Sequence, residues 1–148
     1  MKFRFDIVLP GVIRRFGYDN NNLLFLEVFD FDLYPILLFL TYHSGCQFKV
    51  LYDLTAIDFY GYNHINSSRF CLIYNLLSIQ NNIRVIVKVF EENFCHSVEK
   101  LFPSAGWLER EVWDMFGIFF PSHTDLRRIL TDYGFFGHPL RKGAPFNN

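Results

Sequence analysis

Three acids and one histidine in the C-terminal third are the residues best suited to acid–base chemistry. Glu109, Glu111 and Asp114 stand within six residues of one another, and His123 follows shortly after them. Carboxylates beside an imidazole could serve as general acid and base, or could hold a metal ion that activates water. One hypothesis is therefore a free-standing acid/base or metal-dependent hydrolase that uses Glu111, Asp114 and His123.

The spacing of these residues argues against a shared catalytic site. Glu109 and Glu111 are two residues apart, so on a helix their side chains would point about 160° away from each other. Ser104 and Ser122 lack the Gly-x-Ser-x-Gly pattern of an activated nucleophile. We favour a structural interpretation, in which the acids bind arginine side chains and backbone N–H groups. His123 is then a hydrogen-bonding turn residue.

The remaining patterns indicate no cofactor or metal site. The histidines lack a spacing such as His-x-x-x-His, there is no glycine-rich phosphate loop, and no two cysteines form a Cys-x-x-Cys pair. The cysteines are expected to be small buried residues, and we predict that this chain binds no prosthetic group. The histidines are His43, His64, His96, His123 and His138, and the cysteines are Cys46, Cys71 and Cys95.

The charge pattern of the same segment favours contact with other protein. Five acids and five bases lie between Glu109 and Lys142, threaded through Trp, Phe and Leu. Balanced charges among apolar residues are typical of ion pairs and hydrogen bonds, whereas nucleic-acid binding would call for a net basic run. Arginine can bind carboxylates through two parallel hydrogen bonds, so Arg127, Arg128 and Arg141 are the candidate hot spots. The full predicted interface set is Trp107, Glu109, Arg110, Glu111, Asp114, His123, Arg127, Arg128, Arg141 and Lys142.

Hydrophobic periodicity predicts the elements that position these residues. A helix is predicted over Ala105–Phe116, with Ser104 as its N-cap and an Arg110–Asp114 pair along one face. A short helix is predicted near Asp125–Leu130. The rest of the chain after Pro121 is predicted to be extended.

The elements upstream are predicted from apolar repeats of period two or 3.6. A helix with Asp32 as N-cap and Pro35 in its first turn is expected to bury Leu33, Ile36, Leu37 and Leu40. The strand Phe48–Leu54 is expected to place Phe48, Val50, Tyr52 and Leu54 on one face. Other strands are predicted at Leu23–Phe29, Phe70–Ser78 and Ile83–Phe90, the last two forming a hairpin with Ile83, Val85, Val87 and Val89 facing the core.

These elements predict an α+β fold: a small, mainly antiparallel or mixed sheet packed by helices, with an extended C-terminal tail. Residues 1–120 are predicted to form the core domain, and residues 121–148 to dock on partner subunits. The chain has 148 residues and a formal net charge of −1, so one domain and no polyanionic partner are expected. Because 51% of its residues are hydrophobic, surplus apolar surface is expected at an interface.

The N-terminal residues and the apolar segments bear on the compartment. Leu33–Tyr42 is far shorter than the ~18–20 residues that a membrane-spanning helix needs. Met1–Asp6 resembles neither a signal peptide nor a transit peptide, since the apolar run after it is short and Asp6 is acidic. If the protein works in mitochondria, we therefore expect it to be mitochondrially encoded.

The order and spacing of residues 107–142 resemble the signature of the 30-kDa subunit family of respiratory complex I, the family called NADH dehydrogenase subunit 9 in mitochondria. The likeness extends more loosely back to about Phe48. Thr124, Tyr133 and Gly143 depart from the family pattern, and Gly143 stands where an acid usually follows. The matching residues are Trp107, Glu109–Glu111, Trp113–Asp114, Phe116–Gly117, His123, Leu126, Arg128–Leu130, Gly137 and Pro139–Lys142.

This resemblance implies a non-redox structural subunit in the hydrophilic arm of proton-pumping NADH:ubiquinone oxidoreductase. It implies packing against the 49-kDa subunit near the quinone-reducing module, on the matrix side of the mitochondrial inner membrane. The complex as a whole uses FMN, iron–sulfur clusters, NADH and ubiquinone. An alternative within the resemblance is the homologous subunit of a chloroplast-type NADH-dehydrogenase-like complex or of a membrane-bound hydrogenase.

Overall fold

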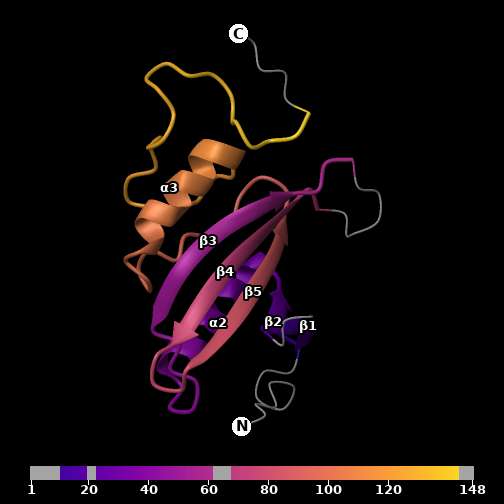
Figure 1. The fold of residues 1–148 in the computed structure, drawn as a ribbon, viewed down its shortest axis with the longest axis vertical. Coiled ribbons are helices and arrows are strands. Elements are labelled where there is room, and N and C mark those ends of the chain that lie inside the picture. The colour runs from indigo at the N-terminus through magenta and orange to yellow at the C-terminus, as the bar shows by residue number, and fades with distance from the viewer. Residues whose placement is uncertain (1–10, 20–22, 62–67, 144–148) are drawn as a thin grey trace.

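A computed structural model of the chain describes residues 11–19, 23–61 and 68–143. These residues form a mixed sheet of five strands with two helices, which confirms the predicted α+β class (Figure 1). In chain order the elements are β1 (Ile13–Tyr18), β2 (Leu24–Val28), α2 (Asp30–Tyr42), β3 (Val50–Asp58), β4 (Phe70–Ser78), β5 (Ile83–Glu91) and α3 (Ala105–Phe116).

The strands lie in the order β1-β2-β5-β4-β3, so the last strand of the sequence is the central one. β2 and β5 run parallel, and every other neighbouring pair is antiparallel. The predicted β4–β5 hairpin is confirmed. Asn82 in its turn takes a positive φ of 50°, a conformation that asparagine tolerates better than most residues.

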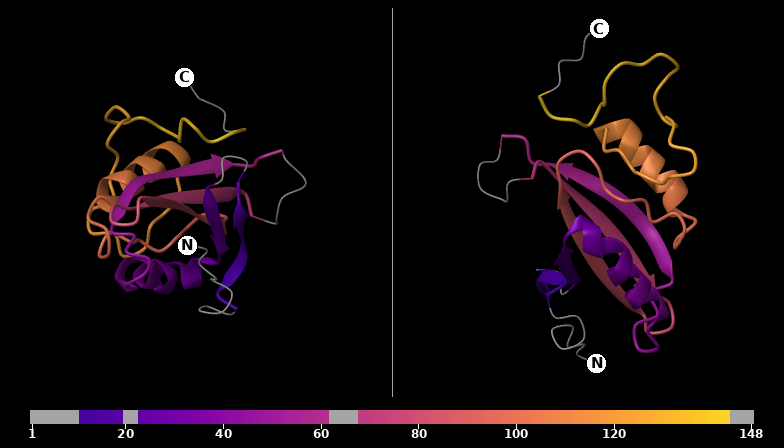
Figure 2. Two further views of the ribbon diagram at one scale, coloured as in Figure 1. Left: turned by 60° about the horizontal axis from the view of Figure 1, so that its bottom comes forward. Right: turned by 180° about the vertical axis from the view of Figure 1, so that it is seen from behind.

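One face of the sheet, the inner face of α2 and the buried side of α3 form the core. Val85, Val87 and Val89 on β5 are fully buried, as predicted, while Ile83 is partly buried. The predicted stripe of α2 is also confirmed, because Leu33, Ile36, Leu37 and Leu40 have no exposed surface. Figure 2 shows α2 lying across this face of the sheet.

Helix α2 begins earlier than its sequence predicts. Its N-cap is Phe29 rather than Asp32, which places Pro35 beyond the first turn. The carboxylate of Asp30 in the first turn accepts hydrogen bonds from the backbone N–H of His96 and from its ring Nδ1, at 2.9 and 2.6 Å. This contact spans 66 residues of sequence, so no local pattern could have predicted the start of the helix.

Strand β3 spans Val50–Asp58 and not the predicted Phe48–Leu54, and it faces differently at Val50 and Tyr52. A register irregularity lies between Leu51 and Asp53, where the pairing with β4 shifts. Such a bulge turns the following side chains to the other face. Leu51 pairs with buried Leu76 before the irregularity and Leu54 follows it, and both are buried. Val50 is only partly buried and Tyr52 is exposed, which corrects the predicted inward face of these two residues.

Helix α3 lies beside β3 and has the predicted bounds (Figure 1). Ser104 occupies the N-cap position, but its hydroxyl donates to the carbonyl of Leu51 on β3 instead of capping the helix. The C-terminal segment then passes over the far end of α3, as both views of Figure 2 show. The predicted helix near Asp125–Leu130 is wrong, because that stretch has no helical turn.

Candidate functional site

The acids of α3 divide between the interior and the surface. Glu109 and Asp114 are fully buried, whereas Glu111 is exposed. This arrangement confirms that Glu109 and Glu111 point in different directions. Asp114 holds part of the C-terminal segment, whereas Glu109 holds the loop at residues 97–98 that precedes the helix.

Asp114 fixes the segment around residue 130. One oxygen accepts the backbone N–H groups of Ile129, Leu130 and Thr131 at 2.8–3.2 Å. The other accepts the Thr131 hydroxyl at 2.7 Å and the Arg128 guanidinium at 3.1 Å. Burial works to raise the pKa of Asp114, but these donors outweigh it and lower the pKa to about 2. The same three N–H groups are unavailable for a helix, which explains why the predicted short helix is absent.

The arginines near Asp114 do not pair as predicted. Arg110 does not bond Asp114; it stacks on Trp107 and donates its Nε–H to the carbonyl of Arg127 at 3.1 Å. Arg128 takes the place at Asp114 and also donates to the carbonyl of Gly137 at 2.9 Å. Arg127 makes an exposed ion pair with Asp125 at 2.8 Å.

Glu109 and His123 form a second buried cluster under the N-terminal half of α3. Glu109 accepts the Ser97 hydroxyl at 2.6 Å and the Val98 N–H at 2.8 Å. Burial nevertheless raises its pKa. His123 accepts the backbone N–H of Asp125 at Nδ1, so its Nε2 carries the hydrogen and donates to the carbonyl of Gly106 at 3.0 Å. The prediction that His123 is a hydrogen-bonding turn residue is therefore confirmed.

The end of the C-terminal segment is tied to the sheet through Asp58, a residue that the sequence did not single out. Asp58 accepts two hydrogen bonds from Arg69 at 3.1 and 2.9 Å and one from the backbone N–H of Lys142 at 2.8 Å. Arg69 also donates to the carbonyl of Lys142 at 2.7 Å. A signal was present in the sequence, since Leu54, Ala56 and Asp58 alternate on the buried face of β3.

Arg141 and His138 complete this attachment. Arg141 donates its Nε–H to the carbonyl of Phe116 at 3.0 Å, and His138 Nδ1 lies 3.0 Å from the carbonyl of Asp114. The N–H of Leu140 donates to the carbonyl of Met115 at 3.0 Å. The segment is thus held along the C-terminal half of α3 by its backbone and by polar side chains.

Several large apolar side chains of the attached segment are exposed, beside charged ones such as Asp125 and Arg127. Tyr133 is fully exposed and Phe136 is 90% exposed. We use the name aromatic surface for the exposed large apolar residues of this segment, of α3 and of the stretch just before Pro121. Its members are Trp107, Phe119, Leu130, Tyr133, Phe136 and Leu140.

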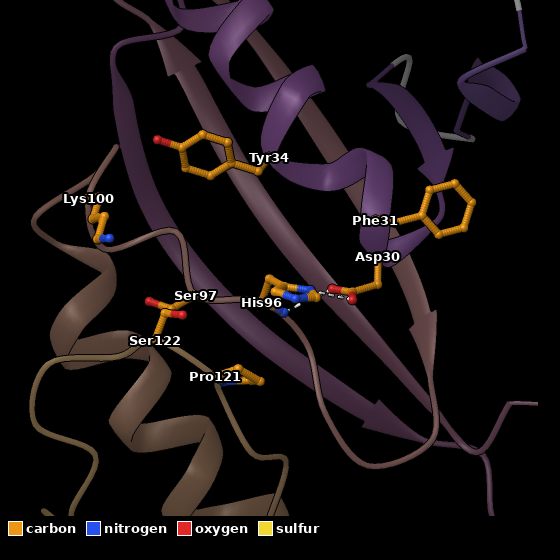
Figure 3. A pocket seen from close by; sticks show the side chains of 8 residues that line it. All are labelled: Asp30, Phe31, Tyr34, His96, Ser97, Lys100, Pro121 and Ser122. Carbon is orange, nitrogen blue, oxygen red and sulfur yellow. Dashed lines mark hydrogen bonds and ion pairs between the residues drawn. The ribbon is translucent and has the colours of Figure 1, made fainter.

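A pocket of about 540 Å³ opens elsewhere, between the first turn of α2 and the loops at 96–100 and 121–122 (Figure 3). Tyr34 and Phe31 come from the helix, and Lys100 and Ser122 from the loops. Asp30 and His96 line it already bonded to each other, as the dashed lines show. None of the predicted site residues lines this pocket.

The site geometry does not assemble the predicted hydrolase centre. Glu111 is exposed, Asp114 is occupied by five donors, and His123 is bonded to backbone groups. Among the described residues, no hydrogen bond or ion pair joins any two of these three, and no group of three His, Cys, Asp or Glu could hold a metal ion. His64 lies outside the described residues. Within the same described ranges, no helix has the length and apolar character to cross a membrane.

The cysteines occupy separate buried places. Cys46 follows α2, Cys71 lies on β4, and Cys95 lies 3.4 Å from the hydroxyl of Tyr74. Burial raises the pKa of Cys46 to about 11 and that of Cys71 to about 12, and it raises the pKa of Cys95 as well. All three are thus protonated thiols at neutral pH.

Comparison of the sequence with known families gives a match over most of the chain. The profile of the family described as "Respiratory-chain NADH dehydrogenase, 30 Kd subunit" matches residues 26–148. Subunit 9 of NADH-ubiquinone oxidoreductase from Reclinomonas americana is 50% identical over 140 residues, which cover 93% of this chain and 66% of that protein. The Prototheca wickerhamii subunit 9 is 52% identical over 143 residues, covering 95% of this chain and 72% of that protein.

A longer relative is the Candida albicans mitochondrial protein named NADH dehydrogenase [ubiquinone] iron-sulfur protein 3. It is 44% identical over 93% of this chain, but this chain spans only 48% of its length. Among solved structures, the trypsin-resistant fragment of Nqo5 matches with a TM-score of 0.66 and 26% identity, over 76% of this chain and 89% of the fragment. An archaeal membrane-bound sulfane sulfur reductase shares the fold, with a TM-score of 0.66 and 19% identity.

Proposed function

Because the chain belongs to the family of the 30-kDa subunit of the respiratory-chain NADH dehydrogenase, we propose that it is a non-redox structural subunit in the hydrophilic arm of complex I. It holds neighbouring subunits in register near the quinone-reducing module, with the 49-kDa subunit as its main partner. Its place is on the matrix side of the mitochondrial inner membrane. FMN, the iron–sulfur clusters, NADH and ubiquinone belong to other subunits of the complex.

The main support for this proposal is that the C-terminal part of the aromatic surface lies on a segment that hydrogen bonds hold against the core. Extended chain with several exposed aromatic side chains is costly in water unless a partner covers it. The five hydrogen bonds to Asp114 hold residues 128–131 in one shape before any partner binds. A surface that is already ordered loses less conformational entropy on binding. Residues 121–148 are therefore proposed to dock on partner subunits while resting on the core formed by residues 1–120.

The absence of a redox role is supported by the chemistry of the thiols. An iron–sulfur cluster would require several cysteine thiolates directed at one point. The three cysteines lie on separate elements with raised pKa values. They do not fit a cluster, so we propose that this chain positions its neighbours and takes no part in electron transfer.

Two observations weigh against the other hypotheses. Glu111, Asp114 and His123 face different surroundings, so the hydrolase has no assembled site. The relatives described above are named as subunits of the ubiquinone-reducing enzyme, which favours complex I over a chloroplast-type complex or a hydrogenase.

The test removes the aromatic surface and follows assembly. In the double variant Tyr133→Ser/Phe136→Ser, two side chains lose an apolar burial contribution of about 3–6 kcal/mol at the interface. We expect the wild-type chain to migrate with the membrane-bound NADH dehydrogenase on native gels, and the double variant to be missing from it. The matched control is Ile79→Ser, which removes a side chain of similar exposure in the β4–β5 turn. Normal assembly of the double variant would overturn the proposal.

A further inference from the structure

Two arginines from distant parts of the sequence share one buried aromatic ring. Arg69 lies 5.0 Å and Arg141 lies 5.2 Å from the centre of the Phe70 ring, measured from each guanidinium carbon. Phe70 itself has no exposed surface. The two guanidinium groups lie at the edge of the sheet where β3 ends and β4 begins, and the C-terminal segment reaches the same place.

The carboxylate at this place is already occupied. Asp58 receives both hydrogen bonds of the Arg69 fork and the backbone N–H groups of Tyr60 and Lys142, at 2.8–3.1 Å. Burial works to raise the pKa of Asp58, but these donors lower it, so Asp58 is ionised at neutral pH. One negative charge therefore faces two guanidinium groups.

Arg141 has no carboxylate partner in the described part of the chain. Its Nε–H donates to the carbonyl of Phe116, which leaves its two terminal amino groups without a partner among the contacts seen there. No ion pair joins it to an Asp or Glu within 4.0 Å in those residues.

The charges at this place do not balance, because two guanidinium groups lie near one carboxylate. Arg141 is partly buried, and burial followed by the charge of Arg69 lowers its pKa. An arginine remains protonated under these conditions, so the local surplus of positive charge is permanent. An outside anion would relieve the repulsion between the two guanidinium groups, and the unused edge of Arg141 fits a carboxylate in a two-bond geometry.

We propose that Arg141 binds an aspartate or glutamate side chain of a neighbouring subunit, which enters beside the Phe70 ring as the missing counter-charge. This inference rests on the proposed function and names one contact within it. The adjoining surface favours protein over a phosphate ligand, because exposed Tyr60 lies 4.8 Å from the Arg69 guanidinium and exposed Leu140 directly precedes Arg141. An apolar border around one charge pair is typical of protein interfaces.

The test introduces an amine at this position and couples it to whatever carboxylate it touches. Arg141→Lys keeps the charge, and a carbodiimide joins an amine to a carboxylate only when the two are in contact. We expect treatment of the assembled complex to yield an amide between position 141 and an acid of a neighbouring subunit, identified by peptide mass spectrometry. The matched control is Arg84→Lys on β5, whose native arginine lies outside the C-terminal segment and stacks on Tyr52 of its own chain, and which should give no link to another subunit.

Three outcomes separate this inference from the proposed function. An amide to Asp58, or no amide in a complex that has assembled, overturns the carboxylate contact and leaves the scaffold role standing. A wild-type chain that does not migrate with the large assembly overturns the scaffold role itself. If Arg141→Lys assembles too poorly for coupling, Arg141→Gln is compared with Arg84→Gln, and we expect release of the subunit to be about 30-fold faster for the former only. Equal release rates for the two would refute the contact.

Discussion

Asp114 and Glu109 lie five residues apart on the same helix and are both fully buried, yet their pKa values move in opposite directions. Burial disfavours the charged form of each. Asp114 is surrounded by five donors, including the Arg128 cation, and these outweigh burial. Glu109 has the Ser97 hydroxyl and the Val98 N–H, and these do not. The number and charge of the donors, which come from elsewhere in the chain, decide the state of each acid.

The first prediction concerns the contribution of Asp114 to stability. Its folded-state pKa of about 2 lies below the ordinary value of 3.8, so its stabilising effect is present above about pH 4 and is lost as the pH falls through 2. The shift corresponds to about 2 kcal/mol. We expect Asp114→Asn to unfold more easily than the wild type at pH 7, with a difference that shrinks as the pH approaches 2.

Urea unfolding at a series of pH values measures this difference. Glu111→Gln is the control, because it removes an exposed carboxylate from the same helix. A difference between wild type and Asp114→Asn that stays constant from pH 7 to pH 2 would contradict the role given to Asp114.

The candidate hot-spot arginines differ in the contacts that each makes within its own chain. Arg127 is exposed, with its partner Asp125 on its own chain. Arg128 bonds Asp114, Thr131 and Gly137. Reversing the charge of Arg128 would therefore disturb the segment itself as well as any interface. Contact between Arg128 and a partner subunit stays a prediction. A substitution of Arg141 is the cleaner test of such a contact.

At the scale of elements, the end of α3 sets the path of everything after it. Gly117 closes the helix in the left-handed conformation, with φ of 73°, and its N–H donates to the carbonyl of Trp113. The His138 ring packs directly over Gly117 and lies 5.5 Å from the Trp113 ring. The helix end therefore needs a residue that allows both the backbone angle and the close approach of the returning chain.

The second prediction separates these two requirements. A Cβ at position 117 would lie 2.5 Å from the His138 ring, whereas a Cβ at position 134 would meet nothing within 4 Å. Both glycines have positive φ, so each alanine substitution carries a backbone cost of about 1–2 kcal/mol. We expect Gly117→Ala to lower the unfolding free energy clearly more than Gly134→Ala, as measured by chemical denaturation. Equal losses would show that the packing of His138 on the helix end contributes little.

At the scale of the whole molecule, the C-terminal segment is bonded to acids of the preceding domain and also exposes several large apolar side chains. Asp114, Asp58 and Glu99 bond the segment from the core side; Glu99 accepts the N–H and hydroxyl of Thr124. The aromatic surface faces away from the core. The α+β domain thus holds the segment in one conformation and leaves the aromatic surface exposed.

The third prediction follows from this exposure. An isolated chain with Tyr133 and Phe136 uncovered should bind a hydrophobic dye such as anilinonaphthalene sulfonate and should elute above its monomer mass of 17.6 kDa. Tyr133→Ser/Phe136→Ser should reduce both effects, while Ile79→Ser should reduce them far less. Equal reductions by the two variants would mean that the aromatic surface is no special site of association.

The sequence by itself determined the helix α3, the β4–β5 hairpin and the buried stripe of α2, because these depend on the spacing of apolar residues along one local element. It also determined the family, since the order of residues 107–142 is specific. Only the tertiary structure decided that Arg128 and not Arg110 bonds Asp114, and that Asp58 holds Lys142 across 84 residues. It likewise decided the start of α2 at Asp30 and the loss of the helix expected near residue 128. In each of these cases a buried carboxylate takes its donors from a distant part of the chain, and the energy of satisfying that charge exceeds the local preferences that a sequence pattern can report.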